Sequence, residues 1–325
     1  MSVFQFCTAA SASDKLPPLN ALPGAVSVSG LSSGAFMAEQ YQVAYSASVV
    51  GAGIVAGGPY YCAMGNMLNT PICMGQFPLM PPNSSLFWFL AQQYASEKKI
   101  DPLANLQKQR IYIFSGTADT KVRQPAVDAT TSFFQIAGVP PENLVYVNNW
   151  PAGHALITPR VPNDCPENEA PYVSHCTADG TQYDQPGEIL QHIYGVLKPP
   201  VTPLPANLLT FDQREFAPEA TSMAQDAYAY IPSLCRNGGC RLHVAFHGCK
   251  QSAAAVGDIF YWQSSYNAWA EGNNVIILYP QVVPSQPLNP DGCWDWYGYS
   301  GWDYAYKSGV QMKAINKMIS RLTAG

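Results

Sequence analysis

The sequence predicts an α/β protein in which helices cover both faces of a mostly parallel sheet. Short apolar runs with strand character alternate along the chain with longer helical patterns, and this alternation is typical of crossover connections between parallel strands. The chain has 325 residues, of which 47% are hydrophobic, so it is long and apolar enough to bury a large core. Only 12% are charged, about half the usual share.

The expected elements follow one another as such a sheet requires. Strands are expected at Ala25–Ser29, Gly51–Ala56, Arg110–Ser115, Asn143–Asn148, Arg241–His247 and Val275–Gln281. Helices are expected at Ala35–Tyr45, Ser84–Ser96, Ala126–Ala137, Gly257–Glu271 and Ala305–Leu322. Residues 197–209 are rich in proline and resemble a linker, but neither half of the chain supplies a full sheet. We therefore expect one domain over residues 25–325, preceded by a loosely ordered segment over residues 1–24.

The first strand leads into a motif that is typical of a nucleophile. The five residues "GLSSG", with Ser32 at their centre, fit the pattern G-x-S-x-G, in which a strand turns sharply into a helix and exposes a serine hydroxyl. Glycine suits both flanks, because other side chains would collide in so tight a turn. The pattern alone also fits a Ser/Gly-rich loop that caps a helix. Whether Ser32 is a nucleophile therefore depends on its partners.

A serine nucleophile needs a base and a carboxylate that orients the base. Asp119 directly follows the strand at 110–115, and His154 follows the strand at 143–148. The chain order serine, aspartate, histidine is that of the α/β-hydrolases, and parallel sheets place their sites at the carboxyl ends of strands. Other candidates lack this context, among them Asp101, Asp128, Asp164 and the remaining four histidines. The sequence thus predicts the triad Ser32, Asp119 and His154 in a catalytic domain.

The order of the remaining elements predicts a circular permutation. An α/β-hydrolase has a strand and an H-G loop upstream of the nucleophile, and this loop supplies part of the oxyanion hole. Here the matching stretch, "RLHVAFHGCKQS" at 241–252, lies far downstream of His154. The chain therefore reads as an α/β-hydrolase cut before the nucleophile strand. The expected oxyanion donors are the backbone N–H groups of Ser33 and Cys249.

With these motifs in this order, the sequence resembles the single-domain, circularly permuted poly(3-hydroxybutyrate) depolymerases. The resemblance rests on "SVSGLSSGAFMA", "AGGPYYCA", "GTADTKV", "GHALIT", "CRLHVAFHGCKQS" and "GCWDWYGYSG". It implies a secreted serine esterase that acts on short-chain polyhydroxyalkanoate polymer or its oligomers, with Ser32, Asp119 and His154 as the triad. Neither a metal nor an organic cofactor is expected. Binding to a solid polymer would use the surface of the catalytic domain itself.

Nine cysteines indicate disulfide bonds and an oxidising compartment. Metal sites usually show C-x-x-C or grouped histidines, and neither pattern occurs in this sequence. The expected pairs are Cys62–Cys73, Cys165–Cys176, Cys235–Cys240 and Cys249–Cys293, which leaves Cys7 unpaired. Secretion or periplasmic export follows, although the first residues lack the basic and apolar parts of a signal peptide. We therefore expect that the natural leader is missing from this sequence.

The aromatic segment "CWDWYGYSGWDYAY" at 293–306 is the candidate substrate-binding region. Aromatic faces suit the methyl and methylene groups of a polyester. Trp302 is the leading candidate for a subsite wall, with Trp294, Trp296 and Tyr299 as further candidates. The alternative for each ring is a place in the core or against a helix.

Composition excludes other classes of function. The net charge is −5 and no basic run occurs, so nothing indicates nucleic-acid binding. No apolar stretch approaches the roughly 20 residues that a membrane span needs, and we expect a monomer. Two alternatives stay open. One is a feruloyl- or acetylxylan-type carbohydrate esterase with the same triad, and the other is a non-catalytic binding protein on a hydrolase scaffold.

Overall fold

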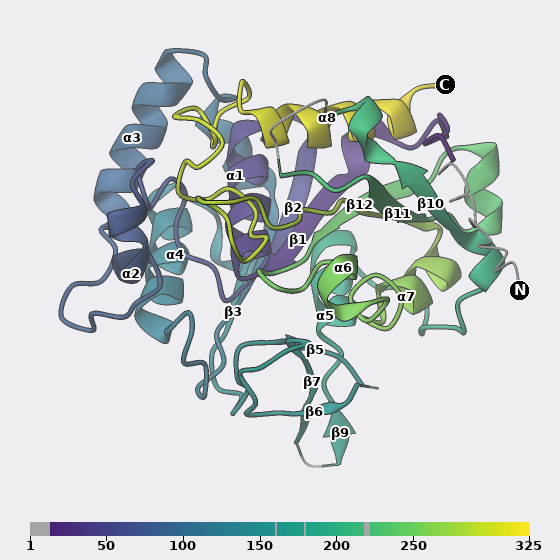
Figure 1. The fold of residues 1–325 in the computed structure, drawn as a ribbon, viewed down its shortest axis with the longest axis horizontal. Helices are drawn as coiled ribbons and strands as arrows, with labels where there is room; N and C mark the ends of the chain where they lie inside the picture. Colours follow the sequence, from purple (N-terminus) through teal and green to yellow (C-terminus); the bar gives the residue numbers. More distant parts are fainter. Residues whose placement is uncertain (1–13, 160, 179, 218–221) are drawn as a thin grey trace, which may run out of the picture.

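The structure is a computed structural model that describes residues 14–159, 161–178, 180–217 and 222–325. An eight-stranded sheet runs through the molecule (Figure 1), in the order β10-β11-β13-β12-β1-β2-β3-β4. Its strands are β1 Val26–Leu31, β2 Val49–Val55, β3 Arg110–Phe114, β4 Leu144–Val147, β10 Leu208–Asp212, β11 Asp226–Tyr230, β12 Arg241–Phe246 and β13 Val275–Tyr279. The pairings β10–β11 and β11–β13 at one edge are antiparallel, while the other described pairings in this sheet are parallel. The predicted mostly parallel sheet is confirmed.

Helices cover both faces of this sheet (Figure 1). α1 and α8 pack on one face, where the Tyr41 hydroxyl donates to Asn316 Oδ1 over 3.0 Å. α5 and α7 lie on the other face, and a Cβ built on Gly53 would come within 2.7 Å of Ile189 in α5. The helices are α1 Ser33–Ala44, α2 Thr70–Cys73, α3 Ser84–Ser96, α4 Gln124–Ile136, α5 Gln185–Tyr194, α6 Ala253–Val256, α7 Tyr266–Asn273 and α8 Val310–Thr323. Every residue of α1 is buried, so the helix that follows Ser32 lies inside the molecule.

Two small sheets lie outside the main one, below it in Figure 1. They contain β5 Leu156–Ile157, β6 Asn163–Asp164 and β7 Val173–His175, and β8 Thr177–Ala178 with β9 Thr181–Gln182. Both belong to the segment between β4 and α5. This segment follows His154 directly, so it forms one flank of the region in which His154 lies.

The two halves of the chain meet at the centre of the main sheet. β1 pairs in parallel with β12, and Val28 lies opposite Val244. The strands of the C-terminal half extend the sheet on one side of β1, and β2, β3 and β4 extend it on the other. The strand that carries the H-G motif is therefore the direct neighbour of the nucleophile strand, as the circular permutation predicts.

A buried polar cluster joins β1 and β12 on the face covered by α5 and α7. His243 is 0% exposed, and its Nδ1 and Nε2 atoms lie 2.6 Å and 2.7 Å from the hydroxyl oxygens of Ser27 and Ser29. These hydroxyls also bond Tyr194 of α5 and Tyr266 of α7. Burial lowers the pKa of His243 to about 3, so the imidazole is neutral and its ring nitrogens are satisfied by neutral hydroxyls.

Several elements differ from the sequence expectations. β10, β11 and α5 were not expected. Residues 257–264 form turns where a helix was expected, and α7 begins only at Tyr266, after Ser265 adopts a φ of +64°. The last helix begins at Val310, because residues 302–308 form turns in place of its expected first turn.

Residues 14–24 are held against the rest of the fold, although a loosely ordered segment was expected over residues 1–24. Residues 1–13, including Cys7, lie outside the described residues. Beyond them the chain is held: Leu16 is 0% exposed, and the N–H groups of Leu19 and Ala21 donate to the carbonyl oxygen of Leu322 in α8. The proline-rich segment at 197–209 is likewise attached, since the Val201 N–H donates to Ala268 of α7.

Candidate active site

Ser32 occupies the turn between β1 and α1 in a conformation that few non-glycine residues adopt. Its φ and ψ are +57° and −123°, which places it among the strained positions that cluster at functional sites. Its N–H donates to the carbonyl oxygen of Val55 at the end of β2. A Cβ on Gly30 would come within 2.2 Å of the Gly34 carbonyl oxygen, so a side chain is excluded there. This is the geometry of a nucleophile elbow.

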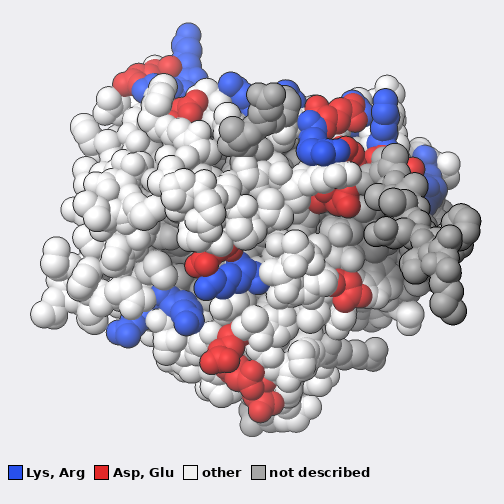
Figure 2. Space-filling view, viewed as in Figure 1, with Lys and Arg blue, Asp and Glu red and all other residues white. Residues whose placement is uncertain are grey.

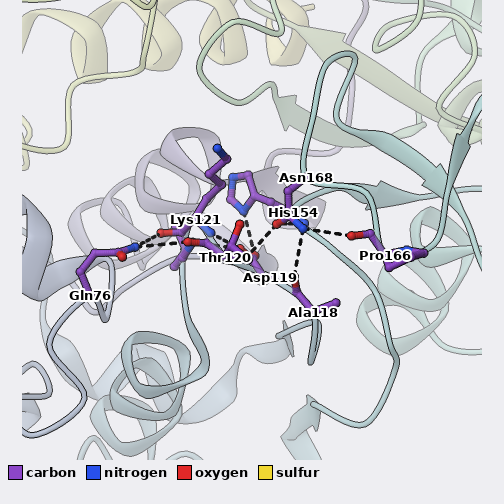
Figure 3. A network of polar contacts seen from close by, with 9 residues as sticks. Gln76, Ala118, Asp119, Thr120, Lys121, His154, Pro166 and Asn168 are labelled. Carbon is purple, nitrogen blue, oxygen red and sulfur yellow. Dashed lines mark hydrogen bonds and ion pairs between the residues drawn. The ribbon is translucent and has the colours of Figure 1, made fainter.

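Asp119 and His154 form a buried pair (Figure 3). Asp119 Oδ2 lies 2.8 Å from His154 Nδ1, and the two side chains are 1% and 6% exposed. The other carboxylate oxygen, Oδ1, accepts the N–H groups of Lys121 and Val122 over 2.8 Å and 3.0 Å. These two backbone bonds orient the carboxylate independently of its bond to the imidazole. Because Asp119 occupies Nδ1, Nε2 is the nitrogen left to exchange a proton with another group.

The loops that carry this pair are bonded to each other. The N–H of Ala118, which follows β3, donates to the carbonyl oxygen of Ala152, which follows β4. A Cβ on Gly116 would lie 2.1 Å from the same oxygen, so only glycine permits so close an approach. The relative position of Asp119 and His154 is thus set by backbone contacts between the two loops.

Asn168 ties the same two loops together through its side chain, and sequence reasoning missed it. Its Oδ1 accepts the N–H groups of His154 and Thr120 over 3.0 Å and 2.9 Å. Its Nδ2 donates to the carbonyl oxygens of Ala118 and Pro166. Figure 3 shows it beside the Asp119–His154 pair. No motif marks this asparagine; its one signal is its position inside the Cys165–Cys176 loop that follows His154.

The H-G loop lies against Ser32. A Cβ on Gly248 would be 3.4 Å from the Cβ of Ser32, although these residues stand far apart in the sequence. The Gly248 N–H donates to Gln251 Oε1 over 2.7 Å, and Gln251 Nε2 in turn donates to the carbonyl oxygens of Pro171 and Tyr172. The loop is thereby fixed both to the nucleophile turn and to the segment that follows His154.

His247 controls the orientation of the next peptide plane. The Val282 N–H donates to His247 Nε2 over 3.1 Å, so the ring proton is on Nδ1 and is donated to the Gly248 carbonyl oxygen 2.7 Å away. Burial lowers the pKa of His247 to about 4, which keeps the ring neutral. The Gly248 carbonyl and the Cys249 N–H belong to one trans peptide and point in opposite directions. Fixing the carbonyl therefore fixes the N–H.

Two backbone N–H groups near Ser32 are free to bind a ligand. Ser33 is the first residue of α1, and its N–H has no acceptor within the helix. In the described part of the chain, neither this N–H nor that of Cys249 donates a hydrogen bond. The pair is the one expected from sequence as an oxyanion hole. Two such donors can stabilise negative charge on an oxygen bonded to the carbon that Ser32 attacks.

Two of the expected substrate-binding aromatics lie in the core. Trp294 is 0% exposed and packs against Phe246 and His247, and its backbone N–H donates to the hydroxyl of Ser33. Trp296 is 7% exposed and stacks on Phe36 of α1 at a centroid distance of 4.4 Å. Both rings fill space around α1. The expectation of substrate contact is therefore corrected for Trp294, and Trp296 has little exposed surface with which to contact a substrate.

Tyr299 and Trp302 retain part of their surface. Tyr299 is half-buried, and its hydroxyl donates to the Cys293 carbonyl oxygen over 2.7 Å. Trp302 is 70% exposed and lies beside Tyr306 and the ammonium group of Lys99. Contact of these two rings with a substrate stays a prediction.

Four disulfides join described residues, and they are the four expected pairs. They are Cys62–Cys73, Cys165–Cys176, Cys235–Cys240 and Cys249–Cys293. The last one connects the H-G loop to the aromatic segment, and the second closes the loop that contains Asn168. Two of the four bonds therefore brace loops at the site.

The described residues contain no group of three or more His, Cys, Asp or Glu side chains placed to hold a metal ion. None of their helices is both long and apolar enough to cross a membrane. A cavity between the 200–203 segment and α7, lined by Trp262 and Ser265 among others, contains no residue of the expected triad.

Two curated proteins are similar to the chain over nearly its whole length, while no protein-family model matches it. A poly(3-hydroxybutyrate) depolymerase from Delftia acidovorans is 42% identical over 317 residues, which cover 95% of this chain and 62% of that protein. A polyhydroxybutyrate depolymerase from Talaromyces funiculosus is 36% identical over 334 residues, which cover 97% of this chain and 94% of that protein. The chain thus spans less than two thirds of the Delftia relative and almost all of the Talaromyces relative.

Two solved structures share the fold. One is a PHB depolymerase with a serine-to-alanine substitution in complex with an R3HB trimer; it aligns with a TM-score of 0.86 and 35% identity over 95% of this chain and 99% of that chain. The other is a PHB depolymerase from Penicillium funiculosum, with a TM-score of 0.84 and 33% identity over the same shares of the two chains.

Proposed function

The chain belongs to the poly(3-hydroxybutyrate) depolymerase family, and on this premise we propose that it is a serine esterase of short-chain polyhydroxyalkanoate or its oligomers. The observation that carries the proposal is the buried Asp119–His154 pair, held at 2.8 Å on loops that follow adjacent strands. The strained turn of Ser32 lies at the same end of the sheet. In the proposed reaction Ser32 is the nucleophile, His154 the base and Asp119 the group that orients the base.

The first half of the reaction forms an acyl-enzyme. A serine hydroxyl is a weak nucleophile at neutral pH, so His154 Nε2 takes its proton while Ser32 Oγ attacks the ester carbonyl carbon. Asp119 holds the imidazole through Nδ1 and stabilises the imidazolium. The bond from the carbonyl carbon to the alcohol oxygen then breaks, and His154 returns the proton to the departing hydroxyl.

The tetrahedral intermediate carries its negative charge on the former carbonyl oxygen. We assign the N–H groups of Ser33 and Cys249 to this oxygen, because they flank Ser32 from the helix side and from the H-G loop. Loss of one such donor typically costs about 3 kcal/mol of transition-state stabilisation. Water then attacks the acyl-enzyme with His154 again as base, and a free carboxylic acid leaves.

The substrate class follows from the relatives and from the composition. A relative of the same fold, carrying a serine-to-alanine substitution, holds an R3HB trimer, and this chain is poor in charged residues. Short hydroxybutyrate esters are therefore the proposed substrates. The four disulfides support folding in an oxidising compartment, and we propose secretion or periplasmic export, with the protein acting as a monomer.

A substrate panel tests the proposal. The purified protein is given R3HB trimer, p-nitrophenyl butyrate, a feruloylated sugar and acetylxylan, and released acid is measured. The proposal predicts that the trimer has the highest kcat/KM. A feruloylated sugar or acetylxylan cleaved at least about tenfold faster than the trimer would assign the carbohydrate esterase function instead. Binding of trimer without any release of acid would assign a non-catalytic role.

A further inference from the structure

Tyr172 adopts a backbone conformation that is unusual for a bulky side chain. Its φ is +58°, in the left-handed region that favours glycine. Three hydrogen bonds hold the backbone in place. The Tyr172 N–H donates to the carbonyl oxygen of Glu169, while its own carbonyl oxygen accepts the Leu156 N–H over 3.0 Å and Gln251 Nε2 over 2.9 Å. Strained positions that the surroundings maintain in this way cluster at functional sites.

The ring of Tyr172 stands against the proposed base. β5 and β7 run parallel with Leu156 opposite Val173, so the residues that precede these strands, His154 and Tyr172, lie at the same end of the small sheet. The two rings are nearly perpendicular, with an interplanar angle of 78° and centroids 6.0 Å apart. His154 is buried, whereas Tyr172 is half-buried. The tyrosine ring therefore keeps surface of its own beside the imidazole.

Gln251 connects Tyr172 to the H-G loop. This side chain is buried, with the residue 0% exposed; its Oε1 accepts the Gly248 N–H and its Nε2 donates to the Tyr172 carbonyl oxygen. Gly248 in turn lies against Ser32, since a Cβ built on it would be 3.4 Å from the Cβ of the serine. Tyr172 is thus joined to the base by its ring and to the loop beside the nucleophile by its backbone.

The same segment also presents charge to solvent. Figure 2 shows Asp and Glu side chains over the region of the small sheets, and Asp164, Glu167 and Glu169 of this segment are exposed. A carboxylate pressed against an uncharged ester would lose water and gain no partner. Tyr172 differs from these residues, because its apolar ring is turned toward His154.

The chemistry of the proposed reaction determines which half of the ester lies beside this ring. His154 Nε2 gives its proton to the oxygen of the departing alcohol, so that oxygen must come within hydrogen-bond reach of the imidazole. In a hydroxybutyrate oligomer the departing alcohol is the next unit of the chain, which carries a methyl and a methylene group. A tyrosine ring beside the imidazole offers these groups apolar surface.

We propose that Tyr172 contacts the unit on the alcohol side of the cleaved ester and selects for a hydroxybutyrate unit there. This inference rests on the proposed function, because it names a specificity-determining residue of the same site. The contact adds no step to the reaction. It stabilises the bound unit and keeps its ester oxygen near His154 Nε2, whereas a leaving group too small to reach the ring gains nothing from it.

The test separates the ring contact from the action of the triad. Hydrolysis of R3HB trimer releases a hydroxybutyrate unit as the alcohol, whereas a fluorophosphonate that reacts with Ser32 releases only fluoride. The labelling rate therefore reports the nucleophile, the base and the oxyanion donors without any alcohol-side unit. We compare kcat/KM for the trimer with the labelling rate in the unaltered protein and in each variant.

Three variants alter Tyr172 and one serves as a control. Tyr172→Ala removes the ring, and Tyr172→Gly removes it while placing at this φ a residue that accepts it without strain. Tyr172→Phe keeps the apolar ring. Tyr61→Ala is the matched control, because Tyr61 is also half-buried and has the same φ of +58°, but its ring stacks on Tyr304 and not on His154.

The two variants without the ring are expected to lose at least about fivefold more in kcat/KM for the trimer than in labelling rate. Labelling itself should stay within about threefold of the unaltered rate, because the triad is intact. Tyr172→Phe and Tyr61→Ala should change neither rate by more than about threefold. Labelling at this rate also shows that the variant is folded, since it needs the assembled site.

Two results would overturn the proposal. The first is trimer hydrolysis by Tyr172→Gly that stays close to the unaltered rate, which would show that the substrate does not need the ring. The second is a parallel loss of both rates in Tyr172→Ala and Tyr172→Gly, which would show that the ring acts only by packing on His154. Failure of the proposed function is recognised separately, from an unaltered protein that does not hydrolyse the trimer or is not labelled on Ser32.

Discussion

A β-carbon built on Gly248 would lie 3.4 Å from the Cβ of Ser32. The two residues belong to opposite halves of the chain, and they meet because β12 pairs with β1 along five positions. The nucleophile turn and the H-G loop thus form one site only when both halves are present. The permutation changes the order in which the two halves are connected, but the H-G loop still lies beside the serine.

A fragment that ends near Leu197 should therefore be unfolded, although it contains the whole proposed triad. It lacks β10 to β13, so β1 would become an exposed edge strand and α1 would lose its partner α8. We expect no cooperative thermal transition by circular dichroism and no ester hydrolysis. A fragment that melts cooperatively and hydrolyses R3HB trimer at near-normal rates would show that the C-terminal half is a separate domain.

Asn168→Ala should lower kcat by roughly 10- to 100-fold, because the loops of Asp119 and His154 lose the side chain that bonds both. KM should change much less, since Asn168 has no proposed contact with substrate. Asn105→Ala is the matched control: Asn105 is also half-buried and bonds Ser46 far from these loops. Equal kinetics for the two variants would remove the positioning role of Asn168.

His247→Leu should lower kcat by about 10²- to 10³-fold, close to the effect of losing an oxyanion donor. The variant removes the hydrogen bond that the Gly248 carbonyl oxygen accepts from His247. The peptide plane is then free to rotate, and the Cys249 N–H is no longer held toward the oxyanion. KM for the trimer should stay within about threefold, since this donor acts mainly in the transition state. His192→Leu, on α5, serves as the control. A His247→Leu effect confined to KM or to thermal stability would contradict the role.

Acid should destabilise the fold through its buried neutral histidines. Burial lowers the pKa of His243 to about 3, below the ordinary value of about 6.5. Between these two pKa values, the histidine is protonated in the unfolded chain and neutral in the folded protein. The stabilisation present above pH 6.5 is therefore lost as the pH falls toward the pKa of the folded state. At pH 4.5 this amounts to about 2–3 kcal/mol for one such histidine.

The acid effect is measured as a difference between proteins. Burial raises the pKa of Glu39, so this carboxyl acts in the opposite direction and the net pH dependence mixes the two. Urea unfolding at pH 7 and pH 4.5 is therefore compared for the unaltered protein and for His243→Asn. The variant should lose less free energy of unfolding between the two pH values. An equal or larger loss in the variant would show that His243 does not titrate in this way.

The parts of the site that could be predicted are those marked by short local sequence patterns. Ser32, Asp119 and His154 each stand where a strand ends, and strand ends in a parallel sheet converge. The H-G motif was recognisable for the same reason, even out of its usual order. The disulfide partners were close in sequence, apart from Cys249 and Cys293.

The missed features depend on tertiary contacts. Asn168 acts only because it bonds three backbone groups of the Asp119 and His154 loops and one of its own loop, and no local pattern encodes that. Trp294 looked like a substrate contact because composition cannot tell which way a ring faces; it is in fact enclosed by Phe246 and His247. β10 and β11 are short strands at the antiparallel edge, where five-residue runs give only a weak periodic signal.

Reaction with a fluorophosphonate tests the role of Ser32 most directly. The reagent forms a stable phosphonyl ester with an activated serine, and mass spectrometry of the digested protein locates the adduct. We predict one adduct per molecule, on Ser32, and no adduct with Ser32→Ala, together with a loss of at least about 10⁴-fold in kcat on R3HB trimer. An adduct on another serine, or a Ser32→Ala variant that keeps trimer hydrolysis within about tenfold, would contradict the assignment of Ser32 as the nucleophile.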